Sequence, residues 1–518
     1  MSLVLTLGVC LLLLVVSRLV ASFASSRRIR RPLPPGPKPR LFIGNLLDLP
    51  KVTPWKTYQE WRQIYGDVIH LHVPWQPIIV LNSAKAALDL LEKRSDIYSD
   101  RIRYRMWTLI GWDFSLAISP YGPIWRSQRR LFHQYFNQTV VHAYQGVQLE
   151  EVRKFLSRAL ESPEHIKEHI NHTFISVILR IVYGKKIQGL SDEYIQIAET
   201  SLDGMNVAAI PGRHWVEFLP FLSYIPSWCI GGDTQRIVKK YRPAVEAMLD
   251  KPLVKINEAL ATGEVMTAAA YDMLKSVKDR NGGELSPENY TLVKNVAGIA
   301  YAAAVETTTA SSEVFLLAMA MHPEVQKKAQ AELDLYVGSN RLPEFYDLDS
   351  LIYIQAIALE VTRWIPVVPN GIAHRLMVDD EYNGYFIPKG TIAIANVWAM
   401  MRDPEDYPEP DVFKPERFIK DGKINTDIRN PNTMAFGFGR RICPGRHLSN
   451  AMFRLFIASI LHVFNVEAGR GRDGKMQELS LETETGLVIR PNTVPHGLKP
   501  RSQAAAASLV RQQSSIDV

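Results

Sequence analysis

The chain has 518 residues, of which 47% are hydrophobic and 22% charged, so it is long enough for one large globular body or for two or three ordinary domains. Its three cysteines, Cys10, Cys229 and Cys443, are too few and too scattered for a disulfide framework, which favours a reducing compartment. The net charge of +7 equals the seven cations within residues 1–40, so residues 41–518 are formally neutral and carry no excess of charge for nucleic acid.

The first segment, Leu3 to Ala24, is almost unbroken hydrophobic sequence and matches the roughly 20 residues that cross a bilayer as a helix. A cleaved signal peptide is the alternative, but it would carry its positive charge before the apolar run, and here the charge follows it. The sequence therefore predicts a single-pass anchor at residues 1–24. The cations that follow favour a cytosolic body, and the endoplasmic reticulum is the expected membrane.

Residues 25–40 are basic and proline-rich, and proline stiffens the chain into an extended spacer. We expect a hinge between membrane and body, although the same prolines could form a PxxP ligand. The body is expected at residues 41–500, and the Ala-, Ser- and Gln-rich residues 501–518 are expected to be a disordered tail.

Helix patterns outnumber strand patterns in the body, and no change of composition divides it. Residues 120–330 read as mostly helical, while Asn383-Gly384 marks a tight turn. The sequence thus predicts a mainly α fold with a small β part. The clearest short elements are a helix at Trp55–Tyr65 and strands at Val68–His72, Ile78–Leu81 and Thr391–Val397.

The longest predicted helix runs from Pro287 to His322. Ser286 is a suitable N-cap, and Pro323 follows the end. At about 1.5 Å per residue this helix spans roughly 50 Å, enough to cross a globular body. Its segment Ala303–Thr309 contains one acid and three threonines, which are costly to bury unless they are paired. Back-bonding of the threonines to helix carbonyls is the simpler explanation of that pattern.

Two further motifs combine acids and arginines. Glu360 and Arg363 form an i,i+3 pair on a predicted helix, a pattern that is common on surfaces and weak by itself. Pro415-Glu416-Arg417-Phe418 follows about fifty residues later.

The segment Phe436–Gly445 holds Cys443 directly before a helix-patterned stretch, His447–Phe464. A helix N-terminus and a neighbouring arginine favour the thiolate, which is what a haem-thiolate iron requires of its ligand. A lone cysteine is more often a small buried hydrophobe. A nucleotide-binding loop is excluded, because Ile442 occupies the place of its third glycine.

These residues fit the pattern Phe-x-x-Gly-x-Arg-x-Cys-x-Gly, and with the preceding motifs the chain resembles a cytochrome P450. The resemblance covers the chain from the anchor to about residue 495 and implies the cytochrome P450 fold with haem b, Cys443 being the iron ligand. The pattern is met at Phe436, Gly439, Arg441, Cys443 and Gly445.

The resemblance also implies roles for other residues. The family's Trp-x-x-x-Arg helix corresponds to Trp125 and Arg129, which with His374 and Arg441 would bind the haem propionates. Thr307 would hydrogen-bond oxygen and Glu306 would help to relay protons, although Ala304 stands where many members have glycine. A buried ion triad would stabilise the haem pocket, formed by Glu360, Arg363 and Arg417.

The implied activity is monooxygenation of a lipophilic small molecule with O2, as in fungal microsomal members that act in secondary metabolism or on xenobiotics. The sequence has no dinucleotide fingerprint, so electrons would come from an NADPH-cytochrome P450 reductase in the same membrane. Two alternatives remain: an electron-independent haem-thiolate isomerase or dehydratase, and a non-catalytic haem-binding membrane protein.

Overall fold

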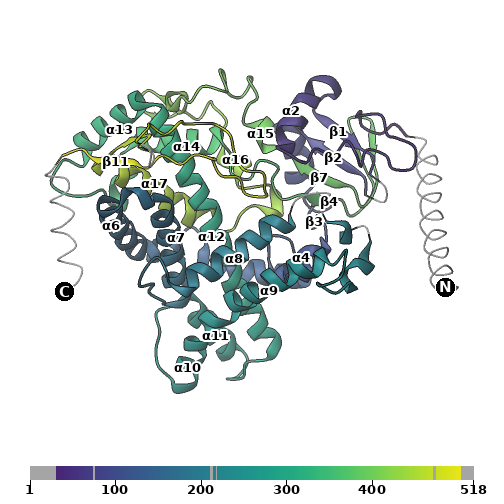
Figure 1. Cartoon of the computed structure of the whole chain (residues 1–518), viewed down its shortest axis with the longest axis horizontal. Coiled ribbons are helices and arrows are strands. Elements are labelled where there is room, and N and C mark those ends of the chain that lie inside the picture. Colours follow the sequence, from purple (N-terminus) through teal and green to yellow (C-terminus); the bar gives the residue numbers. More distant parts are fainter. Residues whose placement is uncertain (1–30, 74–75, 210–213, 218, 471–473, 503–518) are drawn as a thin grey trace. The chain divides into compact units, whose positions relative to one another are not determined.

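The computed structural model describes residues 31–73, 76–209, 214–217, 219–470 and 474–502 (Figure 1). Within these ranges helices dominate and strands are short, so the expected mainly α fold with a small β part is confirmed. The predicted anchor and most of the hinge and tail lie outside the described residues. None of the helices in the described part combines the length and the apolar composition needed to cross a bilayer.

The chain forms two compact units, each assembled from segments that are distant in the sequence. We call the first the sheet unit; it contains Met1–Ile102, Asn370–Met400 and Gly437–Arg441. The second, the helical unit, contains Arg103–Pro369, Met401–Phe436 and Ile442–Val518. Composition could not show this division, because neither unit is a continuous stretch of chain.

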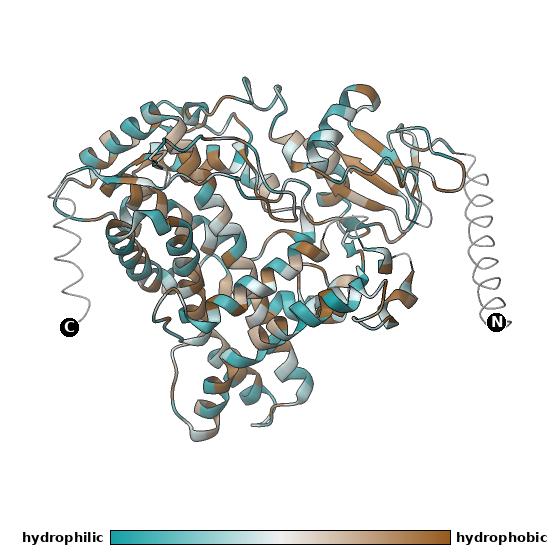
Figure 2. Cartoon of the chain, viewed as in Figure 1, coloured by the Kyte–Doolittle hydropathy of each residue, from teal (hydrophilic) through white to brown (hydrophobic). Residues whose placement is uncertain are grey.

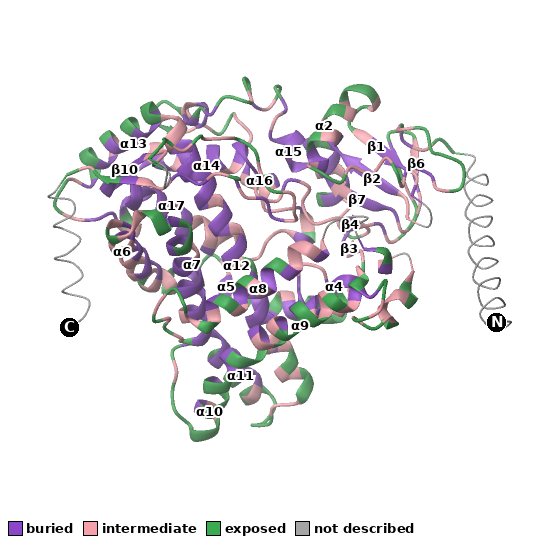
Figure 3. Ribbon diagram, in the orientation of Figure 1, coloured by how far each residue is buried: buried purple, intermediate pink, exposed green. Residues whose placement is uncertain are grey.

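The sheet unit is built on a five-stranded sheet in the order β1-β2-β7-β4-β3. Strands β1 and β2 are antiparallel, β2 and β7 are parallel, and β4 is antiparallel to both β7 and β3. Its three longest strands are made almost entirely of hydrophobic residues and are mostly buried (Figures 2 and 3). The strands are β1 (Val68–Leu71), β2 (Ile78–Leu81), β3 (Asp100–Arg101), β4 (His374–Arg375) and β7 (Ile392–Ala395).

Short helices and a hairpin complete the sheet unit. Helix α2 (Pro54–Tyr65) has proline in its first turn and ends at Gly66, whose φ of 87° suits only glycine. The predicted turn at Asn383-Gly384 joins β5 to β6, and both of its residues have positive φ, as a tight hairpin requires. The remaining α-helices and strands are α3 (Ala84–Ala87), β5 (Asp380–Tyr382), β6 (Tyr385–Ile387) and α15 (Val397–Met400).

The helical unit is organised around α12 (Pro287–Met321), which agrees with the predicted long helix. Ser286 caps it, since its side chain accepts a hydrogen bond from the Asn289 N–H, and Pro287 lies in the first turn. Most residues of α12 and of α17 (Arg446–Val463) are buried (Figure 3).

The other α-helices and strands of the helical unit are, in chain order, α4 (Arg105–Leu109), α5 (Pro123–Phe136), α6 (Gln145–Glu161), α7 (Ile166–Tyr183), α8 (Glu193–Ala208), α9 (Asp233–Asp250), α10 (Val254–Thr262), α11 (Ala269–Arg280), α13 (Pro323–Tyr336), α14 (Ile352–Trp364), β8 (Ile419–Lys420), β9 (Lys423–Ile424), α16 (Asn432–Ala435), β10 (Phe464–Glu467) and β11 (Gly497–Pro500).

Candidate functional site

The loop before α17 holds Cys443 at the start of a helix, as predicted. The Cys443 N–H donates a 2.7 Å hydrogen bond to the Phe436 carbonyl, and Gly445 is the residue that precedes the helix. In the sheet unit, Gly439 has a φ of 53° and packs so closely that a Cβ there would meet the Leu91 carbonyl oxygen at 2.4 Å. Glycine is therefore required at this position of the loop.

The sulfur of Cys443 accepts N–H groups from the first turn of α17. Burial raises the pKa of the Cys443 thiol, while the N–H groups of Gly445 and Arg446 and the positive charges of Arg129 and Arg446 lower it. The raised pKa differs from the expectation of a stabilised thiolate, because the desolvation of the sulfur outweighs these groups. A bound cation would complete the charge balance of the thiolate.

Helix α5 carries Trp125 and Arg129 one turn apart, and Trp125 is buried. Burial lowers the pKa of the Arg129 guanidinium, and the nearby Cys443 raises it. Among the described residues Arg129 has neither a hydrogen-bond acceptor nor an ion-pair partner. A half-buried guanidinium of this kind fits an anionic group of a ligand.

In the sheet unit, basic side chains gather where β3 and β4 pair. Arg101 lies opposite His374 in the register, and its guanidinium donates to the Ile372 and Ala373 carbonyls. The Arg441 Nε donates a 2.7 Å bond to the Ser99 carbonyl. Burial holds the pKa of Arg101 well below its ordinary value, and the charge of Arg441 adds to this effect. Such a cluster suits a ligand with negative charge.

His374 occupies a constrained position in this cluster. Its Nδ1 lies 2.7 Å from the Tyr98 carbonyl oxygen, so Nδ1 carries the ring proton. Burial, followed by the charge of Arg101, holds the pKa of His374 well below its ordinary value. The neutral ring leaves Nε2 as an acceptor, so a direct bond to a carboxylate would require a second proton.

The structure brings Glu360, Arg363 and Arg417 together, as predicted. Two 2.8 Å hydrogen bonds join Arg363 to Glu360, and the Arg417 Nε lies 3.2 Å from Glu360 Oε1. The side chains of Glu360 and Arg363 are completely buried. Backbone carbonyls accept the remaining donors, among them Met401 and Pro410 for Arg363. One carboxylate thus serves two guanidiniums.

Helix α12 separates the two residues that we expected to act together. Ala303 is exposed and Thr307 is half-exposed, in a helix that is otherwise mostly buried, so this stripe borders accessible space. The Thr307 hydroxyl donates to the Ala303 carbonyl at 3.1 Å. Glu306 is buried and pairs with Arg490 at 3.1 Å. Among the described residues no hydrogen bond joins the Glu306 and Thr307 side chains.

Comparison with known proteins agrees with the resemblance. The cytochrome P450 family matches residues 34–495. Cytochrome P450 monooxygenase COX1 of Coprinopsis cinerea is 40% identical over 504 residues, which cover 96% of this chain and 97% of that protein. The chain belongs to the cytochrome P450 family.

Two further relatives are also similar over nearly the whole length of both chains. Cytochrome P450 monooxygenase ple1 of Rhodocybe pseudopiperita is 38% identical over 484 residues, covering 93% of this chain and 92% of that protein. Tryptamine 4-monooxygenase of Psilocybe cyanescens is 34% identical over 509 residues, covering 96% of this chain and 100% of that protein. The protein is therefore a cytochrome P450 monooxygenase, a haem-dependent oxidoreductase.

The residues present in each unit fit the haem that this family implies. Haem needs one strong axial ligand and cationic partners for two propionates. The helical unit offers the Cys443 sulfur and the Arg129 guanidinium, and the sheet unit offers the basic cluster around Arg441.

Sequence reasoning missed Arg101, Glu313 and Arg490. Glu313 could have been found, because it lies seven residues after Glu306 on a helix that the sequence predicts, and therefore on the same face. Arg101 and Arg490 belong to segments without a local pattern, so the sequence carried no signal for them.

Proposed function

We propose that this cytochrome P450 oxidises a lipophilic small molecule with O2 and electrons from an NADPH-dependent reductase, in secondary metabolism or xenobiotic oxidation. The observation that carries the proposal is the Cys443 sulfur, which accepts two N–H groups at the start of α17 and lies near two cations. A sulfur of this kind is suited to bind iron as a thiolate. The fungal relatives named as monooxygenases support the reaction class.

The residues predicted to bind the cofactor have proposed tasks in holding haem b. Cys443 binds the iron, while Phe436, Gly439 and Gly445 shape the loop around the sulfur. The propionates are bound by Trp125, Arg129, His374 and Arg441. When bound, haem supplies activation of O2 and transfer of one oxygen atom to the substrate.

On α12, Thr307 is proposed to bind oxygen and to pass on protons. Its hydroxyl lies on the accessible stripe, and the bond to the Ala303 carbonyl can be exchanged for one to a ligand. The methyl groups of Ala303 and Ala304 make the same stripe apolar, which supports a lipophilic substrate. Glu306 is proposed to supply protons from the buried side of the helix.

Helix α5 supports the proposal of a reductase partner. A hollow of about 330 Å³ along this helix is lined by Trp125 and by Arg126, Arg129, Arg130 and His133. Of these, Arg126, Arg130 and His133 recur every three or four positions and therefore share one exposed face. Such a face favours an acidic protein surface. Arg126→Glu should slow reductase-supported turnover, and unchanged turnover would contradict this docking face.

We propose an endoplasmic reticulum protein with a membrane anchor at residues 1–24, a hinge at 25–40, a catalytic body at 41–500 and a tail at 501–518. Large apolar side chains that are exposed in the helical unit support contact with a membrane; they are Trp215, Phe221, Tyr224, Trp228 and Ile230. Aromatic residues beside cations are typical of membrane interfaces.

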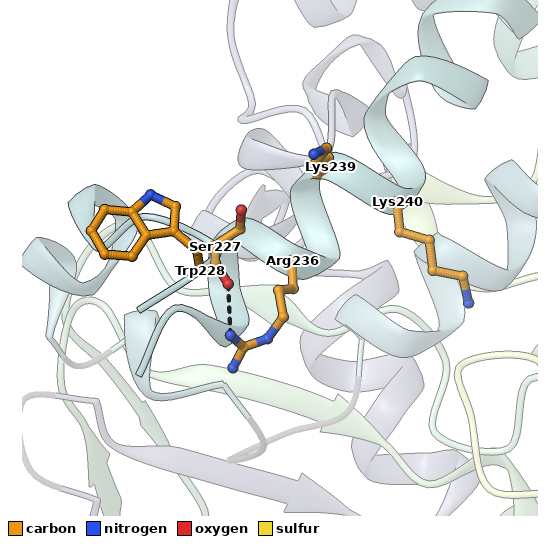
Figure 4. Close-up of a pocket in the computed structure, with 5 residues that line it drawn as sticks. All are labelled: Ser227, Trp228, Arg236, Lys239 and Lys240. Atoms are coloured by element: carbon orange, nitrogen blue, oxygen red, sulfur yellow. Dashed lines mark hydrogen bonds between the residues drawn. The ribbon is translucent and has the colours of Figure 1, made fainter. Parts of the chain in front are cut away.

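Figure 4 shows the Trp228 indole directed away from α9; the pocket at its base is also lined by three cations of that helix, Arg236, Lys239 and Lys240. The Arg236 guanidinium donates a 2.7 Å bond to the Ser227 carbonyl and so fixes the base of this turn. The tryptophan and the lysines are thus placed for a lipid interface. Loss of vesicle binding in a Trp228→Ser, Ile230→Ser variant of the chain without residues 1–30 would support this contact, and unchanged binding would refute it.

The carbon monoxide difference spectrum of the reduced protein tests the proposed haem ligand. We expect a thiolate-type red-shifted Soret band in the wild type and its loss in Cys443→Ser. A well-folded wild type without a haem band would instead favour the binding-protein alternative.

Turnover separates the remaining alternatives. NADPH consumption that depends on reductase and yields an oxidised product supports the monooxygenase, and conversion without NADPH would indicate an isomerase or dehydratase. The substrate panel should contain lipophilic ring compounds and tryptamine, because one relative is named for that amine.

A further inference from the structure

Helix α12 carries two carboxylates that share one arginine. Glu306 and Glu313 are seven residues apart, which is about two helical turns, so they lie on the same face. The Arg490 Nη2 lies 3.1 Å from Glu306 Oε2, and its Nη1 lies 3.1 Å from Glu313 Oε1. A single guanidinium therefore bridges both carboxyl groups.

The bridge is withdrawn from solvent. The side chains of Glu306, Glu313 and Arg490 are 7%, 0% and 21% exposed. Two buried negative charges against one positive charge are costly, because water cannot stabilise the excess. Binding of one proton to a carboxylate removes that excess and leaves a neutral cluster.

Hydrogen bonding identifies the carboxyl group that holds the proton. Glu306 accepts from two donors, the Arg490 guanidinium and the Asn206 Nδ2 at 3.2 Å, so both of its oxygens are partnered. Glu313 accepts from Arg490 alone, and its buried Oε2 has no partner among the described residues. The anion with more donors is better stabilised, which leaves the unpartnered Glu313 oxygen to carry the proton.

The surrounding charges agree with this assignment. Burial raises the pKa of the Glu313 carboxyl; Arg490 and Lys167 of α7 lower it, and Glu306 and Glu484 raise it. The net direction is upward, so the proton is retained above the pH range in which an exposed glutamate loses it. For Arg490, burial opposes the charge, but Glu306 and Glu313 outweigh it and raise the pKa, so the arginine stays charged.

We propose that Glu313 carries a proton at neutral pH, and that Glu306, Arg490 and Glu313 form a neutral cluster with one exchangeable proton. Because Arg490 can balance either anion, uptake of a proton by Glu306 allows Glu313 to release its own without a change in net charge. The cluster thus gives α12 a buried proton store. Proton exchange within the cluster requires neither a particular substrate nor the reductase.

Infrared spectroscopy of the full-length holoprotein at pH 7 tests the proposal. We expect a carboxylic acid C=O band that shifts in D2O, and we expect Glu313→Gln to remove it. Glu306→Gln should remove it as well, because Arg490 would then pair with an ionised Glu313. Glu258→Gln is the matched control on an exposed helix position and should leave the band unchanged.

Aspartate variants show which carboxyl group holds the proton. Glu313→Asp should move the band, while Glu306→Asp should leave it in place. A wild-type Soret band shows that each variant is folded. A spectrum that is unchanged by Glu313→Gln would mean that both carboxyls are ionised, and a band that moves only in Glu306→Asp would place the proton on Glu306. Either result overturns the proposal.

Discussion

Two buried ion clusters of the helical unit have opposite stoichiometry. In the first, Glu360 is one carboxylate between two guanidiniums, Arg363 and Arg417. In the second, Arg490 is one guanidinium between two carboxylates, Glu306 and Glu313. A guanidinium does not lose its proton in proteins, whereas a carboxylate can gain one. The first cluster is therefore fixed in charge, and the second can adjust its charge with pH.

Breaking the fixed cluster should have the largest effect. Glu360→Gln leaves two buried guanidiniums without an anion, and backbone carbonyls alone cannot neutralise them. We expect a loss of about 3–5 kcal/mol in the free energy of unfolding, together with a lower haem content. Chemical denaturation followed by tryptophan fluorescence measures the loss. Glu246→Gln, which breaks an exposed pair with Arg242, is the control and should cost less than about 0.5 kcal/mol.

Breaking the adjustable cluster should cost less, and the cost should depend on pH. Arg490→Met leaves two buried carboxyl groups that can both become neutral by binding protons. Each proton costs about 1.4 kcal/mol for every pH unit above the ordinary glutamate pKa. One additional proton over two pH units amounts to about 2.8 kcal/mol, so we expect the loss at pH 7.5 to exceed the loss at pH 5.5 by about 2–3 kcal/mol. Equal losses at both pH values would mean that the carboxyl groups do not take up protons.

Glu313→Gln tests the adjustable cluster through the sign of its effect on the pH dependence of stability. The folded-state pKa of Glu313 lies above the unfolded value, so the folded protein binds more protons and becomes less stable as pH rises. Glutamine removes this loss. We expect the variant to gain about 1–2 kcal/mol relative to wild type between pH 5.5 and 7.5 in denaturant titrations. A difference that stays constant with pH would contradict a raised pKa.

The smallest effect is expected for Asn206, which distinguishes the two carboxyl groups. Asn206→Leu removes one hydrogen bond to Glu306, with a cost of about 1 kcal/mol. The two carboxyls then become more alike, and the proton should distribute between them. A second C=O band in the infrared spectrum would show this, and a single unshifted band would mean that Asn206 does not select the site.

The sequence predicted those parts of the molecule whose signals are local. Serine and proline at the ends of α12 allowed its bounds to be predicted. The glycines and arginines around Cys443 allowed the loop before α17 to be predicted. The motif at Glu360 indicated a buried triad only through resemblance, since an i,i+3 pair alone is common on surfaces.

What the sequence did not show depends on contacts between distant segments. Arg490 reaches α12 from 184 positions further along the chain, and Asn206 reaches Glu306 from 100 positions before it. The different surroundings of Glu306 and Thr307 also depend on distant segments. The sequence places these two residues next to each other, but in the structure Glu306 pairs with Arg490 and Thr307 bonds to the Ala303 carbonyl. Adjacent positions on a helix point about 100° apart, and only the neighbouring segments decide which side meets accessible space.

Strand β2 can pair with β7 only after the ribosome has synthesised β7, which comes much later in the chain. Ile78 pairs with Ile392, which is 314 positions later. A ribosome that adds about 5–20 residues per second leaves β2 without this partner for roughly 15–60 s. During that time a strand of four buried hydrophobic residues has an open edge. Newly made chains should therefore depend on chaperones until β4 and β7 have left the ribosome. Chains translated from mRNAs that end before the codon for residue 392 should aggregate.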